Sequence, residues 1–112
     1  MNYYNNTRHL RNDMIINNIK YYNSRKFFCP IGKSACTYNF TVEFTPMLVI
    51  PDYLVIDELI DGLSSELTIE DALNGVFNIF LNEVNPLELK VTCMCDDARP
   101  SKVEVTKELR HG

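Results

Sequence analysis

The longest regular pattern in the chain is a single amphipathic helix. Thr68 is a candidate N-cap for this helix, and Asp71 stands three residues later, as in a capping box. Asn85 and Pro86 end the segment. Apolar side chains recur at helical spacing along one face, namely Ile69, Leu73, Val76, Phe77, Phe80, Leu81 and Val84. A helix with one apolar face must cover another element, so a second layer is required.

Segments on both sides of this helix alternate between apolar and polar residues, which predicts strands. Residues 37–44, 87–93 and 103–106 follow this pattern, and a loop over residues 96–101 would join the last two as a hairpin. A further strand within residues 48–56 would pair with residues 37–44, and Pro51 would place it at an edge or a break. A short helix over residues 57–63 would end at Gly62.

The resulting order β-β-α-β-β predicts an α+β fold: an antiparallel sheet with helices on one face. The 112 residues suffice for one domain, which we expect over residues 25–112. Residues 1–24, rich in Asn and Tyr, are expected to form a partly flexible arm, or a short helix around residues 14–19 that packs on a neighbour. A sheet this small usually gains stability from a partner, so we expect an oligomer.

Charge is distributed unevenly along the chain. Residues 1–33 carry six basic side chains against Asp13, whereas the remainder carries five basic and fourteen acidic ones. The basic segment could contact nucleic-acid phosphates, or it could be a solvated leader. No apolar run approaches the roughly 20 residues that span a bilayer, and the N-terminus lacks the apolar core of a signal peptide. We therefore expect a cytoplasmic protein without membrane contact.

Four cysteines, Cys29, Cys36, Cys93 and Cys95, are the main candidates for chemistry. In a cytoplasmic protein, free thiols, a metal site or catalysis are expected before disulfides. Cys29 and Pro30 lie just before the first predicted strand, and Lys26 and Lys33 nearby could favour the Cys29 thiolate. Spacing alone leaves two interpretations of Cys29 open: a buried apolar residue or a nucleophile.

Three motifs resemble those of the 7-cyano-7-deazaguanine reductases, which have a tunnelling fold. Cys29-Pro30-Ile31-Gly32-Lys33, with the strand that ends at Pro46, is similar to the segment that carries their nucleophile. Ile69-Glu70-Asp71-Ala72 is similar to their His-Glu-Asp-Cys, which opens the main helix. Residues 84–91 are similar to their Asp-Pro followed by a strand. The resemblance covers roughly residues 27–106.

This resemblance implies a tunnelling fold in which the sheets of several subunits form a barrel with active sites at subunit junctions. Cys29 would attack the nitrile carbon of 7-cyano-7-deazaguanine and form a thioimide. Glu70, with Asp71 beside it, would bind the guanine-like edge of the base, because a carboxylate matches adjacent N–H donors. Cys36 stands where the family has a proton-transferring Asp, so it would either act in catalysis, form a disulfide with Cys29, or ligate a metal.

One departure from the family concerns the cofactor. The reductases carry a Glu-x-Lys-x-x-Lys nicotinamide motif, but residues 50–59 contain three acids and no Lys. Reductase-like amidinotransferases that form archaeosine also lack this motif, and they let ammonia attack the thioimide. The sequence therefore predicts amidine formation without a cofactor, on a 7-deazaguanine that is free or in tRNA or DNA. Nicotinamide-dependent reduction and a non-catalytic purine-binding or interaction module are the alternatives.

A zinc site is a further alternative. The four cysteines would suffice for tetrahedral zinc, although their spacing does not match a standard zinc knuckle. The two histidines, His9 and His111, lie near the chain ends and match no ligand pattern. We therefore predict no metal ligand.

Overall fold

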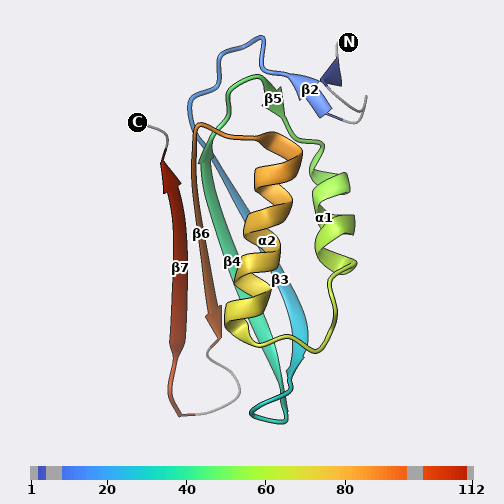
Figure 1. The fold of residues 1–112 in the computed structure, drawn as a ribbon, viewed down its shortest axis with the longest axis vertical. Coiled ribbons are helices and arrows are strands. Elements are labelled where there is room, and N and C mark those ends of the chain that lie inside the picture. The colour runs from blue at the N-terminus through green and yellow to red at the C-terminus, as the bar shows by residue number, and fades with distance from the viewer. Residues whose placement is uncertain (1–2, 5–8, 96–99, 111–112) are drawn as a thin grey trace.

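The computed structural model describes residues 3–4, 9–95 and 100–110, which form two antiparallel sheets and two helices (Figure 1). The elements in chain order are β1 (Tyr3–Tyr4), β2 (His9–Arg11), β3 (Ile19–Cys29), β4 (Ser34–Thr45), β5 (Val49–Ile50), α1 (Tyr53–Asp61), α2 (Ile69–Val84), β6 (Glu88–Cys95) and β7 (Val103–Arg110). No helix among the described residues has the length and apolar character needed to cross a bilayer.

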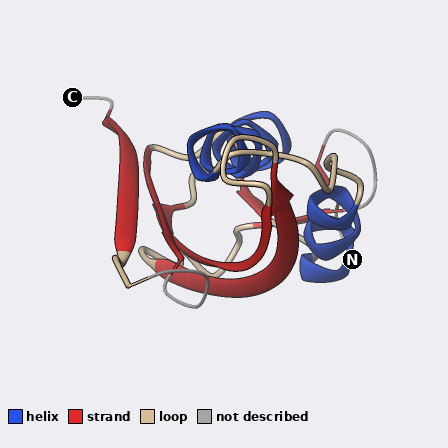
Figure 2. Cartoon of the chain, turned by 90° about the horizontal axis from the view of Figure 1, so that it is seen from below, coloured by secondary structure: helices blue, strands red, loops and turns tan. Residues whose placement is uncertain are grey.

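The main sheet has the strand order β3-β4-β6-β7, and every neighbouring pair is antiparallel. It is strongly curved, and the long helix α2 lies along its inner face (Figure 2). Tyr21 on this face of β3 contacts Phe80 of α2 and Tyr53 of α1, at ring-centroid distances of 5.3 and 6.1 Å, so both helices cover the same face. The α+β prediction with helices on one face of an antiparallel sheet is confirmed.

The core lies between α2 and the inner face of β4 and β6. Alternate residues of β4 are buried, from Cys36 to Phe44, as the sequence pattern predicted. Burial of these side chains and of the apolar face of α2 removes apolar surface from water, which is the main stabilising term for such a layer. Phe44 meets Phe80 at a centroid distance of 5.4 Å. The predicted helix and the predicted strand over residues 37–44 are both confirmed.

The partner of β4 differs from the prediction. β4 pairs with β3 over eleven residue pairs, from Ile19↔Phe44 to Cys29↔Ser34, and with β6 on its other side. Residues 19–24, which we assigned to the N-terminal arm, are thus part of the main sheet, and no helix forms around residues 14–19. The polar side chains that obscured this strand have partners: Asn23 donates to Tyr21 Oη, and Arg25 donates to the Ile60 carbonyl at 2.6 Å.

The predicted strand within residues 48–56 was also wrong. Only Val49 and Ile50 are extended, and they pair with β2 rather than β4. Asp52 then caps α1, because its side chain accepts the Leu54 N–H at 3.0 Å. The helix continues to Asp61 with Gly62 as its C-cap, so the predicted stop at Gly62 is confirmed although the helix starts earlier than expected.

His9 joins the small sheet β1-β2-β5 to both helices at the C-terminal end of α2. Its side chain is 1% exposed. The Asp52 N–H donates to Nδ1 at 2.9 Å, so the ring proton lies on Nε2, which donates to Glu83 Oε1 at 2.9 Å. Both ring nitrogens therefore have partners, and His9 links β2, the start of α1 and the end of α2.

Candidate active site

A cavity of about 270 Å³ opens at the end of the main sheet where the β3–β4 turn meets the first turn of α2. Its lining residues come from four places: the turn, the start of β4, the start of α2, and the ends of β6 and β7 that face each other. They are Cys29, Ile31, Gly32, Ser34, Cys36, Tyr38, Thr68, Ile69, Glu70, Cys95, Ser101 and Val103. Three of the four predicted site residues, Cys29, Cys36 and Glu70, are among them.

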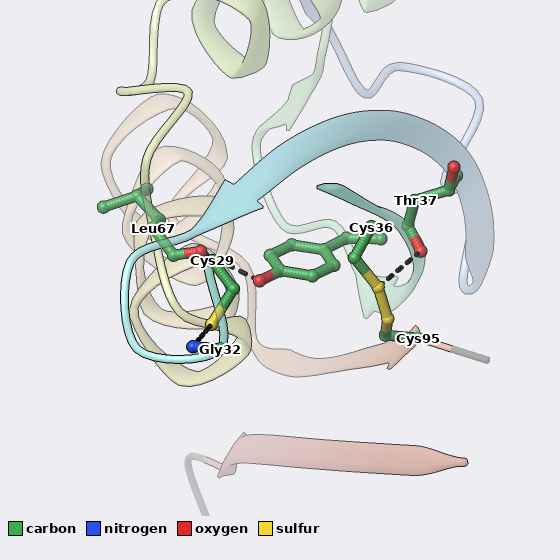
Figure 3. The surroundings of a disulfide bond; sticks show 7 residues. Cys29, Gly32, Cys36, Thr37, Leu67 and Cys95 are labelled. Carbon is green, nitrogen blue, oxygen red and sulfur yellow. Dashed lines mark hydrogen bonds between the residues drawn. A yellow bond between two sulfur atoms is a disulfide. The ribbon is translucent and has the colours of Figure 1, made fainter. Parts of the chain in front are cut away.

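Cys29 is the last residue of β3 and its side chain is half-buried. The tight turn after it is closed by the Lys33 N–H, which donates to the Cys29 carbonyl at 2.8 Å, and Lys33 itself has a left-handed φ of 53°. Within this turn the Gly32 N–H lies 3.4 Å from Cys29 Sγ and points toward it (Figure 3). A backbone N–H aimed at sulfur stabilises negative charge there. The turn therefore presents a thiol to the cavity with one donor beside it.

Glu70 reaches the cavity from the first turn of α2. Thr68 caps this helix, because its Oγ1 accepts the Asp71 N–H at 3.2 Å, which confirms the predicted N-cap. Glu70 is exposed and lines the cavity, so its carboxylate is available to a ligand. Asp71 is also exposed but is not among the lining residues. Of the two predicted base-binding residues, the cavity includes Glu70.

Cys36 forms a disulfide with Cys95, which corrects the prediction of a catalytic Cys36 thiol and also the alternative in which Cys36 pairs with Cys29 (Figure 3). The β4–β6 ladder extends as far as Asn39↔Met94, so the bond joins the two strands just beyond its last pair. The two residues are 59 positions apart in sequence, and only the pairing of β4 with β6 brings them together. While this bond is intact, Cys36 Sγ carries no proton that it could transfer.

The remaining thiol, Cys93, lies in the core at 0% exposure. Burial raises the pKa of Cys93 to about 12, and the negative charge of Glu70 adds to the shift. No group of three or more His, Cys, Asp or Glu side chains within residues 3–4, 9–95 and 100–110 is arranged to hold a metal ion. Because two of the four cysteines are bonded to each other, the four-thiolate zinc alternative has no support.

Tyr38 is a lining residue that the sequence pattern identified only as part of the core. It is 2% exposed, and its Oη donates to the Leu67 carbonyl at 2.9 Å. Burial raises the pKa of Tyr38 to about 12, and negative charge on Cys29 would add to the shift. The phenol shares the cavity with the Cys29 thiol.

The fold of this chain is similar to that of a solved structure. No family model and no curated protein matches the sequence. The chain superimposes on the crystal structure of the archaeosine synthase QueF-Like in the apo form with a TM-score of 0.76. The match covers 83% of this chain and 93% of that chain at 21% identity. This likeness shows that the chain has the fold of that synthase, and it confirms the QueF-like resemblance at the level of the fold.

Proposed function

We propose that this protein acts on the nitrile of 7-cyano-7-deazaguanine through a thioimide on Cys29 and forms an amidine in nucleic-acid modification. The observation that carries the proposal is the meeting of Cys29 and Glu70. The two residues are 41 positions apart in the numbering and come from different elements, yet both line one cavity. They do so in a chain that has the fold of an archaeosine synthase.

The chemistry requires one nucleophile and one proton movement. Cys29 Sγ bonds to the nitrile carbon, one π bond of C≡N breaks, and the nitrogen gains the proton that the thiol loses. Ammonia then attacks the same carbon, and Cys29 leaves as the thiol while an amidine remains. The Gly32 N–H beside Sγ would stabilise the negative charge that develops on sulfur while its proton is being transferred.

Glu70 would orient the base. A carboxylate accepts two parallel hydrogen bonds from a ring N–H and an adjacent exocyclic NH₂, which a guanine-like edge offers together. The alternative role of Glu70 is a first-turn acid that interacts with the helix dipole of α2. Its exposure to the cavity supports the ligand role, because the side chain can turn toward a bound base.

Reduction with a nicotinamide cofactor is less well supported than amidine formation. In the reductases the corresponding segment carries lysines, whereas here it runs from Ile50, the last residue of β5, through most of α1. Its acids have structural contacts: Asp52 caps α1, and Asp57 accepts a hydrogen bond from Tyr21. An acidic surface at this place would repel the phosphates of the cofactor.

Two partners belong to the proposal. The first is a second copy of the chain, because β3 and β7 are the outer strands of the main sheet within the described residues, and such edges favour strand pairing. A neighbouring subunit would close the open side of the cavity, which already contains Cys29 and Glu70 of one chain. The second is nucleic acid. Lys20, Lys26 and Lys33 are exposed and could contact phosphates, whereas Arg25 is bonded to Ile60.

The test is a covalent adduct detected by intact-mass spectrometry. The protein is incubated with 7-cyano-7-deazaguanine, and the modified peptide is mapped. We expect one adduct per chain on Cys29, none in Cys29→Ala, and an unchanged adduct in the control Cys93→Ala, since Cys93 is buried in the core. Absence of an adduct in the wild type, or an adduct on another residue, would refute the proposal.

A further inference from the structure

The proposed reaction needs a group that moves a proton beside Cys29, and the disulfide removes one candidate. Addition of the thiol across C≡N transfers a proton from sulfur to nitrogen, and a side chain that relays it accelerates such a step. Cys36 is bonded to Cys95 and has no proton to relay. The other lining hydroxyls belong to Ser34, Tyr38, Thr68 and Ser101. Thr68 Oγ1 caps α2 by accepting the Asp71 N–H, which fixes it at the helix start.

Two contacts hold Tyr38 in place, and a third holds the ring on which it stacks. Its ring stacks on Phe27 at a centroid distance of 4.7 Å and an interplanar angle of 17°. The Arg25 guanidinium lies 4.6 Å from the centroid of Phe27. At the other end of the ring, Oη donates to the Leu67 carbonyl at 2.9 Å, which ties β4 to the residue before the α2 N-cap. A buried phenol fixed in this way has a defined position relative to the cavity.

Tyr38 and the reactive thiol share one cavity. Tyr38 lines it together with Cys29 and Glu70, and negative charge on Cys29 adds to the effect of burial on the pKa of the phenol. A phenol oxygen can accept one hydrogen bond while it donates another. It can therefore accept the thiol proton while its own proton leaves toward a ligand, with a rotation of the O–H away from Leu67.

We propose that Tyr38 is the proton relay of this site: as Cys29 Sγ bonds to the nitrile carbon, Tyr38 Oη donates its proton to the nitrile nitrogen and accepts the proton of the thiol. The step is balanced, because the S–H and O–H bonds that break are replaced by N–H and O–H bonds, and Tyr38 ends in its starting state. No oxidant or reductant is needed. This inference rests on the proposed nitrile chemistry. It assigns to Tyr38 the proton transfer that the family gives to an Asp, at the position where this chain has Cys36.

The environment of Tyr38 favours a role in which the phenol exchanges one proton for another over a role in which it releases its proton alone. Because burial raises the pKa of Tyr38 to about 12, the phenol keeps its proton at neutral pH. A phenolate in this position would be costly, so the hydroxyl releases its proton only as it gains the one from Cys29. Transfer and attack are thereby coupled.

The experiment measures the rate of adduct formation with 7-cyano-7-deazaguanine in Tyr38→Phe between pH 6 and pH 9. Tyr22→Phe is the matched control, since Tyr22 is 67% exposed on the neighbouring strand. We expect a loss of about 100-fold or more in rate at neutral pH. The rate in Tyr38→Phe should then rise with pH, because attack now needs a thiolate formed in advance, whereas wild type and Tyr22→Phe should depend less on pH. Noncovalent affinity, measured in a Cys29→Ala background, should change by less than about threefold.

The outcomes separate this inference from the proposed function. A wild type that forms the adduct while Tyr38→Phe forms it within threefold of the same rate overturns the relay and leaves the nitrile chemistry standing. A rate that falls only in step with noncovalent affinity also overturns it, because that result describes a structural role. A wild type without adduct refutes both. If Tyr38→Phe does not fold, 3-fluorotyrosine at position 38 replaces it; its more acidic phenol should shift the pH profile, and an unshifted profile overturns the relay.

Discussion

The two ends of α2 have polar groups of opposite character. At the C-terminal end, His9 is buried with both ring nitrogens hydrogen-bonded, to Asp52 and Glu83. At the N-terminal end, about 24 Å away along a 16-residue helix, Cys29 is half-buried and the Gly32 N–H approaches its sulfur at 3.4 Å. A cavity lies beside Cys29.

This difference separates a structural site from a functional one. Buried polar groups in stable regions find partners for their hydrogen-bonding atoms, as His9 does. Groups that bind or react with a ligand must keep capacity free for it and must be reachable through a pocket. Changes at the His9 end should therefore alter stability without altering reactivity, and most changes at the Cys29 end should do the reverse.

The disulfide is the exception to this rule and has the largest expected effect on stability. Cys36→Ser combined with Cys95→Ser removes a cross-link between residues 59 positions apart. The chain-entropy relation gives a loss of about 4 kcal/mol in the free energy of unfolding. Urea titration measures the loss, with Cys29→Ser as a control that leaves the bond intact.

Thiol titration checks the premise of that prediction. The denatured wild type should have two reactive thiols, Cys29 and Cys93, and four after treatment with a dithiol. Four reactive thiols before reduction would contradict the presence of the disulfide. A Cys36→Ser/Cys95→Ser variant as stable as the wild type would contradict its expected contribution to stability.

His9→Ala should destabilise the fold by about 3 kcal/mol, because it removes the buried acceptor of the Asp52 N–H and one donor to the Glu83 carboxylate, and leaves a cavity in place of a 1% exposed ring. Arg11→Ala on the same strand is the control, since Arg11 is exposed and its ion pair with Asp13 at 3.8 Å is a surface contact. The rate of adduct formation at Cys29 should be unchanged in the folded fraction of both variants. A selective loss of that rate in His9→Ala would show that the two ends are coupled.

Glu70→Gln should weaken binding of the base tenfold to a hundredfold, roughly the value of hydrogen bonds to a charged group. Calorimetry in a Cys29→Ala background measures this without the covalent step. Stability should change by less than about 1 kcal/mol, because the residue is an exposed first-turn acid. Asp71→Asn is the neighbouring comparison: an equal or larger loss there would assign the base to Asp71 instead.

The smallest expected effect is a dependence of stability on alkaline pH. Burial raises the pKa of Cys93 from 9.0 to about 12, so above pH 9 the unfolded chain releases a proton that the folded chain retains. The stabilising contribution is complete below pH 9 and is lost as pH rises toward 12, at about 1.4 kcal/mol per pH unit. Cys93→Ala should reduce this slope in urea titrations at pH 8 to 10. An identical slope in both proteins would contradict the burial argument.

Sequence patterns predicted the elements whose burial is one-sided. The helix at residues 69–84 and the strand at residues 37–44 have regular apolar spacing, and both formed as expected. β3 was missed because Asn23 and Arg25 occupy positions that face α1, where hydrogen bonds to Tyr21 and Ile60 satisfy them. The pattern of a single sequence does not reveal such partners, because they can be distant along the chain. Ile60, for example, lies 35 residues from Arg25.

The candidate site was predictable in its motifs but not in its connections. The Cys29 and Glu70 motifs were found by resemblance, and the cavity brings them together. The Cys36–Cys95 bond depends on the register of β4 with β6, which four cysteines alone cannot define. Tyr38 has the same alternation as its core neighbours, and only the contacts of its hydroxyl distinguish it.

A structure of the protein with 7-cyano-7-deazaguanine tests the central claim most directly. The account predicts a covalent bond between Cys29 Sγ and the former nitrile carbon, with the Glu70 carboxylate at about 3 Å from the guanine-like edge of the base. An unmodified Cys29, with the base absent from the cavity or bound away from Glu70, would contradict it.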